Sequence, residues 1–251
     1  MTTLFISDLH LSPSQPELLQ LSCQFLRSQA ATIDSLYILG DIFNTWLGDD
    51  LLPAEFAPFV QTLQSLSAQG IRLYLMVGNR DFMLGQDFAH SVGATLLTEP
   101  AFVELAGKKA LLLHGDSLCT DDVSYQRYRR WVRNPILQWC FLKLPVRFRQ
   151  GISDKIKAKS REQKQFKTAM IMDVNQQAVE TVMQQQQVDL LIHGHTHRPA
   201  IHHLMVNNEA AHRVVLGDWD QQHISYLLAD DHSLYLHDHR LINGCSILRL
   251  V

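Results

Sequence analysis

Short runs of apolar residues recur along most of the chain, and each run ends in a polar cluster containing glycine, aspartate or histidine. Five such runs cover residues 4–6, 36–39, 73–77, 110–113 and 190–192. Continuous apolar runs of this length are typical of strands that are buried on both faces. Helical spacing over residues 16–29 and 54–69 separates the first three runs. This alternation predicts βαβ units and a largely parallel sheet.

The pattern changes after Arg213, where apolar stretches follow one another at short spacing. These stretches are residues 214–218, 223–228, 233–236 and 246–250. Short connections of this kind favour strands that pair in an antiparallel manner. We therefore expect a second sheet, of mixed or antiparallel type, that packs on the first.

Residues 121–170 interrupt this scheme, because they show helical spacing and aromatic residues but no strand that ends in a polar cluster. Pro135 and Pro145 are expected to divide the segment into separate helices, since proline cannot continue a helix beyond its first turn. At 251 residues, 46% of them apolar, the chain is long enough for one large domain. We predict a single α/β domain over residues 1–251 with a helical lid inserted at residues 121–170.

Charge is unevenly distributed along the chain. Residues 120–170 carry 13 Lys and Arg against 4 Asp and Glu, although the net charge of the whole chain is −3. The insertion is therefore strongly basic and the rest of the chain is acidic. Such a localised excess requires an explanation of its own.

Composition also excludes several classes of protein. No stretch reaches the roughly 18 uncharged apolar residues that a membrane-spanning helix needs, and the first residues show no secretory signal. The cysteines show no C-x-x-C spacing, so neither a zinc knuckle nor a disulfide framework is indicated. They are Cys23, Cys119, Cys140 and Cys245. We expect a protein of the reducing cytoplasm.

The polar clusters supply carboxylate, imidazole and amide groups directly after the predicted strands. The side chains concerned are Asp8, His10, Asp41, Asn79, His114, His195 and His197. The carboxyl ends of strands in an open α/β sheet lie along one edge, where ligands bind. Residues i and i+2 of an extended segment point to the same side, so the D-x-H and H-x-H pairs can each reach one ion. Seven oxygen and nitrogen ligands exceed what one ion requires, and two ions that share a carboxylate fit the number better.

This ligand mixture favours Mn²⁺, Fe²⁺, Co²⁺ or Zn²⁺. A pair of such ions suits hydrolysis at phosphorus, because both can hold its oxygens as charge builds in the transition state. Taken singly, each cluster has an ordinary explanation as a turn, a helix cap or a hydrogen-bonded histidine. The occurrence of all five after strands favours the metal site. His193 lies one residue before a turn and is expected to face away from that site.

The motifs D-x-H, G-D, G-N-x-D, H and G-H-x-H between Asp8 and His197 resemble the signature of the calcineurin-like metallophosphoesterase family. The resemblance implies a sandwich of two β-sheets flanked by helices, with a dinuclear centre at the strand ends. It also implies a division of the ligands. Asp8, His10 and His197 would bind one ion, Asn79, His114 and His195 would bind the other, and Asp41 would bridge them.

The third motif departs from the family pattern, because Arg80 stands where most members have a histidine that assists the leaving group. Arginine cannot act as a general acid near neutral pH, but its fork of donors can clamp a second phosphate group. This residue therefore favours a pyrophosphate substrate. The alternative is that Arg80 forms an ion pair with Asp81 or another acid. We predict Asp41, Asn79, Arg80 and His114 as the catalytic residues.

A closer resemblance, to the UDP-2,3-diacylglucosamine pyrophosphatases of lipid A biosynthesis, rests on residues 6–11, 40–50, 78–82 and 114–116. It implies attack of water on the α-phosphorus, which gives UMP and 2,3-diacylglucosamine 1-phosphate. It further implies two Mn²⁺ ions and peripheral binding to the cytoplasmic face of a Gram-negative inner membrane. By motif position, the residues that contact the substrate would be Asn79, Arg80, Asp122, Ser160, Lys164, Lys167 and His195.

The insertion interleaves apolar and basic residues between Arg127 and Arg149. This mixture suits a surface that meets acyl chains and anionic headgroups. Two alternatives are an amphipathic insertion that packs on the core and a groove for single-stranded nucleic acid. No nucleic-acid module accompanies the segment, so we expect no nucleic-acid partner. For the whole chain, the alternatives are a metallophosphatase or nuclease acting on a soluble phosphoester, and a scaffold that has lost catalysis.

Overall fold

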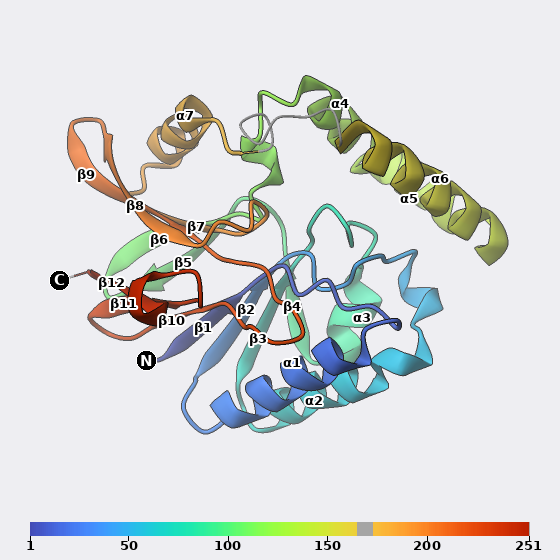
Figure 1. Cartoon of the computed structure of the whole chain (residues 1–251), viewed down its shortest axis with the longest axis horizontal. Coiled ribbons are helices and arrows are strands. Elements are labelled where there is room, and N and C mark those ends of the chain that lie inside the picture. Colours follow the sequence, from blue (N-terminus) through green and yellow to red (C-terminus); the bar gives the residue numbers. More distant parts are fainter. Residues whose placement is uncertain (165–172, 251) are drawn as a thin grey trace.

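The chain folds into two β-sheets that pack face to face, with helices on both outer sides, as seen in the computed structural model (Figure 1). The structure describes residues 1–164 and 173–250, of which residues 159–164 are described by their backbone alone. This arrangement is the α/β sandwich that the sequence predicts.

The first sheet has seven strands in the order β12-β11-β10-β1-β2-β3-β4. Strands β1 to β4 are parallel, whereas β10, β11 and β12 continue the sheet in antiparallel pairing. Their bounds are β1 Thr3–Ile6, β2 Ser35–Leu39, β3 Arg72–Met76, β4 Ala94–Leu97, β10 Tyr226–Ala229, β11 Ser233–His237 and β12 Cys245–Arg249.

The second sheet has five strands in the order β5-β6-β7-β9-β8. Strands β6, β7 and β9 are parallel to one another, and β5 and β8 pair in antiparallel fashion at the two edges. The bounds are β5 Ala101–Leu105, β6 Lys108–Leu112, β7 Leu190–His193, β8 Ala200–Val206 and β9 Glu209–Val215.

The expectation that the strands after Arg213 form the second sheet was only partly right, because residues 214 and 215 end β9 of that sheet but the later strands do not belong to it. Strand β10 instead pairs with β1, where Leu228 lies opposite Leu4, and β11 and β12 extend the same sheet. The second sheet is built around β6 and β7, two of the runs that had been placed in the first sheet. Strand β1 pairs with β2 on one side only, which leaves its other edge open to a further strand. Strands joined by short turns can add to this edge as readily as they can form a sheet of their own.

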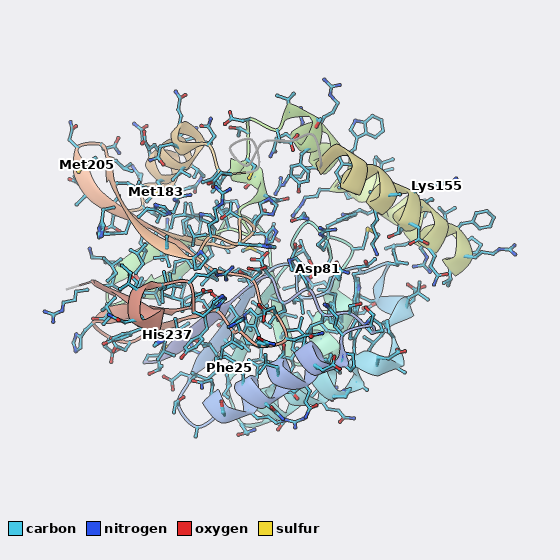
Figure 2. All side chains as sticks on the ribbon, viewed as in Figure 1. Phe25, Asp81, Lys155, Met183, Met205 and His237 are labelled. Atoms are coloured by element: carbon cyan, nitrogen blue, oxygen red, sulfur yellow. The ribbon has the colours of Figure 1, made fainter. Side chains whose placement is uncertain are left out.

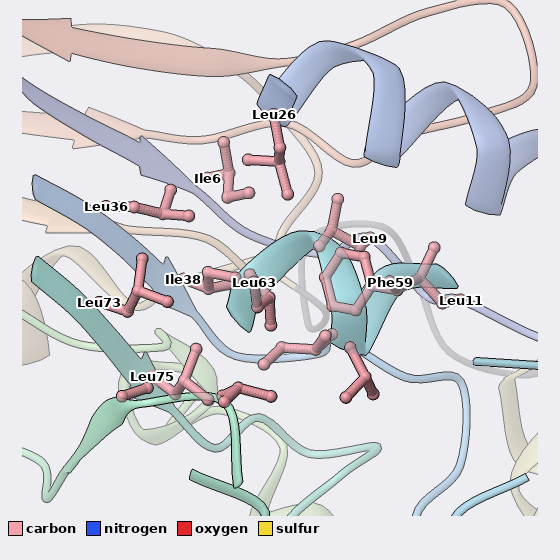
Figure 3. Packing of buried hydrophobic residues seen from close by; sticks show 14 of the residues in the cluster. Ile6, Leu9, Leu11, Leu26, Leu36, Ile38, Phe59, Leu63, Leu73 and Leu75 are labelled. Atoms are coloured by element: carbon pink, nitrogen blue, oxygen red, sulfur yellow. The ribbon is translucent and has the colours of Figure 1, made fainter. Parts of the chain in front are cut away.

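Alternation along the central strands divides the core into layers. Leu4 and Ile6 of β1 pack against α1 (Pro16–Gln29) and α2 (Ala57–Ala68), whereas Phe5 between them faces the second sheet. Figure 3 shows Ile6 beside Leu26 of α1, with Phe59 and Leu63 of α2 in the same cluster. Burial of one such side chain contributes roughly 1.5–3 kcal/mol. The outer face of the second sheet is covered by α7 (Gln176–Gln186) through Val179 and Met183.

The remaining helices lie at the edges of the sandwich and in the insertion. The helix predicted over residues 54–69 begins as a 3₁₀ turn and continues as α2. The short elements are α3 Gln86–Ser91 and the 3₁₀ helices η1 Asp49–Leu51, η2 Ala54–Phe56, η3 Asp116–Leu118 and η4 Ile242–Gly244.

The described part of the insertion, up to residue 164, contains three helices, and they are α4 Val123–Val132, α5 Pro135–Leu142 and α6 Val146–Lys164. The predicted breaks are confirmed, because Pro135 begins α5 and Pro145 immediately precedes α6. Figure 1 shows α5 and α6 extending away from the sheets to one side of the sandwich. Among the described residues, no helix is both long enough and apolar enough to span a bilayer.

Candidate metal centre

The loops that follow β1, β2, β6 and β7 meet at one end of the sandwich. The Asp8 amide donates to the Gly40 carbonyl at 3.1 Å, and the His10 amide donates to the Asp41 carbonyl at 2.9 Å. On the second sheet, the Gly194 amide donates to the His114 carbonyl at 2.9 Å. The His195 amide of the second sheet donates to Asp8 Oδ2 of the first at 2.9 Å, so the structure brings clusters from both sheets to one place, although the sequence placed their strands in a single sheet.

Five of the seven predicted ligands have a left-handed backbone. Their φ angles are 55° at Asp8, 49° at His10, 52° at Asp41, 70° at His195 and 58° at His197. This conformation costs an L-residue roughly 1–2 kcal/mol. These residues make up half of the ten non-glycine residues with positive φ in the described part of the chain. Strain concentrated in this way is typical of functional sites.

Asp8 is fully buried and presents one carboxylate oxygen without a partner. Its Oδ2 accepts from Ser7 Oγ at 2.5 Å and from the His195 amide at 2.9 Å. Within the described residues its Oδ1 accepts no hydrogen bond, but it lies 3.4 Å from His197 Nε2 and 4.0 Å from His10 Nε2. Burial would raise the pKa of Asp8, but the nearby imidazoles of His197, His114 and His10 hold that pKa below its ordinary value. An orphaned buried oxygen facing two imidazoles fits a cation site.

A second group of ligands surrounds the side chain of Asn79. Asn79 Oδ1 lies 3.1 Å from His114 Nε2 and 2.8 Å from His195 Nδ1. The other ring nitrogen of His114, Nδ1, lies 2.9 Å from the Leu39 carbonyl, which holds the ring in one orientation. These are the three residues that the family resemblance assigns to a second ion.

Asp41 lies between the two groups. Its Oδ2 is 3.7 Å from His10 Nδ1, and its Oδ1 is 3.7 Å from His114 Nε2. Oδ1 also accepts from the Arg80 amide at 2.7 Å. A Cβ at Gly78 would lie 2.1 Å from Oδ1, so the close approach of the two loops requires glycine at this position. The carboxylate is thus oriented with one oxygen toward each group.

These residues fit divalent ions. Two sets offer ligand atoms that all lie within 4.8 Å of one another, namely Asp8, His10 and His197, and Asp8, Asp41 and His114. The donors are carboxylate oxygens and imidazole nitrogens without thiolates, which suits divalent cations such as Mn²⁺. The described residues thus include all seven predicted ligands in one cluster.

Residues 1–199 match the model of the family described as calcineurin-like phosphoesterase. The chain belongs to this family. Membership in the calcineurin-like phosphoesterases implies a hydrolase that uses divalent metal ions, and the two ligand sets fit that requirement.

Individual relatives are similar over nearly the whole length of this phosphoesterase, and each carries the name UDP-2,3-diacylglucosamine hydrolase. One from Tolumonas auensis is 49% identical over 94% of this chain and 96% of its own. One from Serratia proteamaculans is 48% identical over 87% of this chain and 91% of its own. One from Pseudomonas aeruginosa is 46% identical over 88% of this chain and 92% of its own.

Asp81, to which the sequence assigned no role at the site, ties the ligand loops of this phosphoesterase together. It is fully buried, and its carboxylate accepts from the amides of Gly78 and Ile42 at 2.7 Å each and of Asp41 at 3.3 Å. Figure 2 shows Asp81 between the sandwich and the insertion. The alternative that Arg80 pairs with Asp81 was therefore wrong. Arg80 is exposed, and it forms no ion pair with any residue that the structure describes.

Asp116 anchors the insertion two residues beyond a predicted ligand. Its buried Oδ2 accepts from Tyr125 Oη at 2.6 Å, Arg129 Nε at 2.8 Å and Arg133 Nη2 at 3.4 Å. The three donors are four residues apart, so Tyr125 and Arg129 of α4 and Arg133 at its C-cap lie on the same side of this helix. Arg129 also pairs with Glu99 at 2.7 Å. The sequence signal for this contact was the regular spacing of the three donors.

Part of the basic excess therefore has a structural role that the sequence interpretation missed. Arg129 and Arg133 hold α4 on the core, and Arg149 of α6 pairs with Asp50 and donates to the Leu47 carbonyl at 2.8 Å. These three arginines do not contribute to the membrane-facing surface expected from the sequence, because their guanidinium groups are engaged with carboxylates and carbonyls of the sandwich.

Asp218 was also missed as a member of the site. Its Oδ2 lies 3.2 Å from His197 Nδ1, and its Oδ1 accepts from Arg240 Nη1 at 2.7 Å. A carboxylate in this position fixes the orientation of a ligating imidazole. The available signal was Gly217-Asp218 after an apolar stretch, which repeats the form of Gly40-Asp41.

The predicted substrate contacts are only partly described. Asp122 is the N-cap of α4 and accepts from the Tyr125 amide at 3.0 Å and from Ser124 Oγ at 2.8 Å. Lys167 and the side chains of Ser160 and Lys164 lie outside the described residues. Their roles stay predictions.

Proposed function

We propose that this chain hydrolyses the pyrophosphate bond of UDP-2,3-diacylglucosamine and releases UMP and 2,3-diacylglucosamine 1-phosphate. The relatives described above carry the name of this activity. The observation that carries the proposal is the position of Asp41, whose two oxygens each lie 3.7 Å from an imidazole of a different ligand group. A carboxylate so placed suits a dinuclear centre. When bound there, a pair of ions, which we propose to be Mn²⁺, lowers the pKa of a bound water and offsets negative charge on phosphate oxygens.

We propose separate roles in metal binding and substrate binding for individual residues of the chain. Asp8, His10 and His197 are proposed to hold one ion, Asn79, His114 and His195 the other, and Asp41 both. Arg80 follows Asn79 directly, and its amide donates to Asp41 while its exposed guanidinium has no carboxylate partner among the described residues. Its planar fork suits the second phosphate of a pyrophosphate. Further contacts to the substrate are proposed for Asn79, Asp122, Ser160, Lys164, Lys167 and His195.

The insertion is proposed to meet the acyl chains and the cytoplasmic face of the inner membrane. Among the described residues, 11 of the 17 large apolar side chains that are exposed lie on it, including Ile136 at 70%, Trp131 at 64% and Trp139 at 62%. No residue of α5 is fully buried, and only the partly buried Phe141 of this helix packs against the main core cluster. Arg127, Arg130, Lys143 and Arg147 are exposed among these apolar residues. Apolar surface with a basic rim favours binding to an anionic bilayer.

The decisive experiment measures UMP released from UDP-2,3-diacylglucosamine in detergent, with the chain freed of metal and then supplied with Mn²⁺. UMP formation that depends on Mn²⁺ is the expected result. Absence of UMP from folded, metal-loaded protein would contradict the proposed substrate and direct attention to soluble phosphoesters.

A further inference from the structure

A cavity of about 300 Å³ adjoins the metal centre on the second sheet. His197 and Thr196 form part of its wall, together with three arginines, Arg198, Arg213 and Arg240. We call it the arginine cavity. Of the seven predicted metal ligands, His197 alone lines it among the described residues. The cavity is thus a neighbour of the metal centre and not a part of it.

Two of the three arginines already have carboxylate partners. Arg198 forms an ion pair with Asp173, and Arg240 pairs with Asp218 at 2.7 Å and with Asp238 at 2.6 Å. These pairs neutralise much of the charge in the wall. The remaining arginine of the wall is Arg213 of β9.

Arg213 is 7% exposed, and its Nε and Nη1 are buried without a hydrogen-bond partner among the described residues. It lies opposite His202 of β8, which also lines the cavity. Burial lowers the pKa of Arg213, and the charge of Asp173 opposes this effect only in part. A buried guanidinium without a partner is rare in proteins, because desolvation of the charge is uncompensated.

The chemistry of this site points to a phosphate group. A guanidinium offers donors in a planar fork that matches the oxygens of phosphate, and the surrounding Thr196 and His202 can add further hydrogen bonds. The volume lies at the lower end of the range for small-molecule sites, which suits a phosphate or a small phosphate ester better than a large apolar ligand.

We infer that the arginine cavity is a second phosphate-binding site, with Arg213 as its principal ligand. The site does not depend on the substrate proposed above. Its ligand is inorganic phosphate or the phosphate of a small monoester such as a nucleotide, and these two sources share the recognised chemistry.

Isothermal titration of the full chain with inorganic phosphate, and separately with UMP, tests this site. Arg213→Met removes the charge and keeps most of the length, whereas Arg249→Met makes the same change at an exposed arginine of β12. Loss of one charge-assisted contact is expected to weaken binding by about tenfold or more in Arg213→Met and to leave Arg249→Met like the wild type. Arg213→Lys, which retains the charge without the fork, is expected to give an intermediate affinity.

The titrations are made on Mn²⁺-loaded and on EDTA-treated protein, because the metal ions themselves bind phosphate. The loss caused by Arg213→Met is expected in both states. A loss seen with both ligands indicates recognition of the phosphate alone, and a loss seen only with UMP indicates a nucleotide site; either result supports the inference. Unchanged binding of both ligands to a folded Arg213→Met variant, checked by circular dichroism, would overturn it.

Discussion

The Oδ2 of Asp218 lies 3.2 Å from Nδ1 of His197, on the opposite side of the imidazole ring from the nitrogen that faces Asp8. Asp218 is itself held by Arg240, which also donates to the His197 carbonyl at 3.2 Å. The imidazole ring of His197, a proposed metal ligand, is therefore oriented by the carboxylate of Asp218, which is itself held in an ion pair with Arg240. This relationship connects the C-terminal part of the chain with the metal centre.

Replacement of Asp218 by Asn is expected to weaken the binding of Mn²⁺ by about 10- to 100-fold, because the imidazole loses the carboxylate that orients it. The fold should be retained, since the amide has the same shape. Titration of metal-free protein with Mn²⁺ measures the effect. Asp220→Asn, at an exposed residue that pairs with His223, is the matched control. Equal affinity in both variants would exclude a positioning role for Asp218.

Replacement of Asp41 by Ala is expected to reduce UMP release by more than about 100-fold and to lower the number of bound Mn²⁺ ions, since its two oxygens each lie 3.7 Å from an imidazole of a different ligand group. Turnover assays and metal analysis of the purified variant check this. Asp87→Ala, at an exposed position of α3, should behave like the wild type. Near-normal activity of Asp41→Ala would argue against a dinuclear centre.

Arg80→Ala is expected to leave thermal stability unchanged, because the side chain is exposed and forms no ion pair with the described residues. Its kcat/KM should fall by roughly 10- to 100-fold, the effect of losing a charged hydrogen bond to the substrate. Steady-state kinetics, together with a melting curve, separate the two effects. If kcat and KM equal those of the wild type, Arg80 does not clamp phosphate.

Binding of metal is expected to release protons and to strengthen as pH rises from about 6 to about 9. Burial alone would lower the pKa of His197, but the adjacent carboxylates of Asp218 and Asp8 raise it to about 10. Burial likewise opposes protonation of His114, but Asp41 and Asp8 raise its pKa to about 9. Both imidazoles are therefore protonated near pH 7 without metal and must lose a proton to bind an ion. Calorimetry in two buffers of different ionisation enthalpy measures this release, and a pH-independent affinity would contradict it.

The double variant Trp131→Ser, Trp139→Ser is expected to bind vesicles of anionic phospholipid at least about tenfold more weakly than the wild type, because two apolar anchors are lost. Its stability should change little, since both side chains are more than 60% exposed. Vesicle sedimentation measures the binding. Met205→Ser and Ile247→Ser remove apolar side chains of similar exposure far from the insertion and serve as controls. A double variant that binds vesicles like these controls would refute the membrane surface.

Much of the architecture could be predicted from local pattern. The apolar runs before Asp8, Asp41 and His114 are strands in the structure, and Pro135 and Pro145 mark the helix boundaries in the insertion. These features depend on a few consecutive residues, because strand burial and helix termination are decided by neighbours along the chain.

The pairing of the C-terminal strands could not be predicted in the same way. Strand β10 joins β1 with Leu228 opposite Leu4, and the alternation of apolar residues in β10 is equally compatible with the edge of either sheet. The choice depends on which edge is free after the other strands have packed, and this is a property of the whole sandwich.

The partners of the buried carboxylates likewise could not be predicted from the local sequence pattern. Asp81, Asp116 and Asp218 each follow a glycine or a ligand motif and could each be taken for a turn residue. In the folded chain Asp81 accepts from the amide of Ile42, 39 residues away, and Asp116 from Arg129 of α4. The positions of the strands and of the predicted ligands follow from short-range apolar and polar pattern. Which polar groups satisfy one another follows from the packing of the two sheets and the insertion, because a buried carboxylate must pair with the donors that the fold brings within reach.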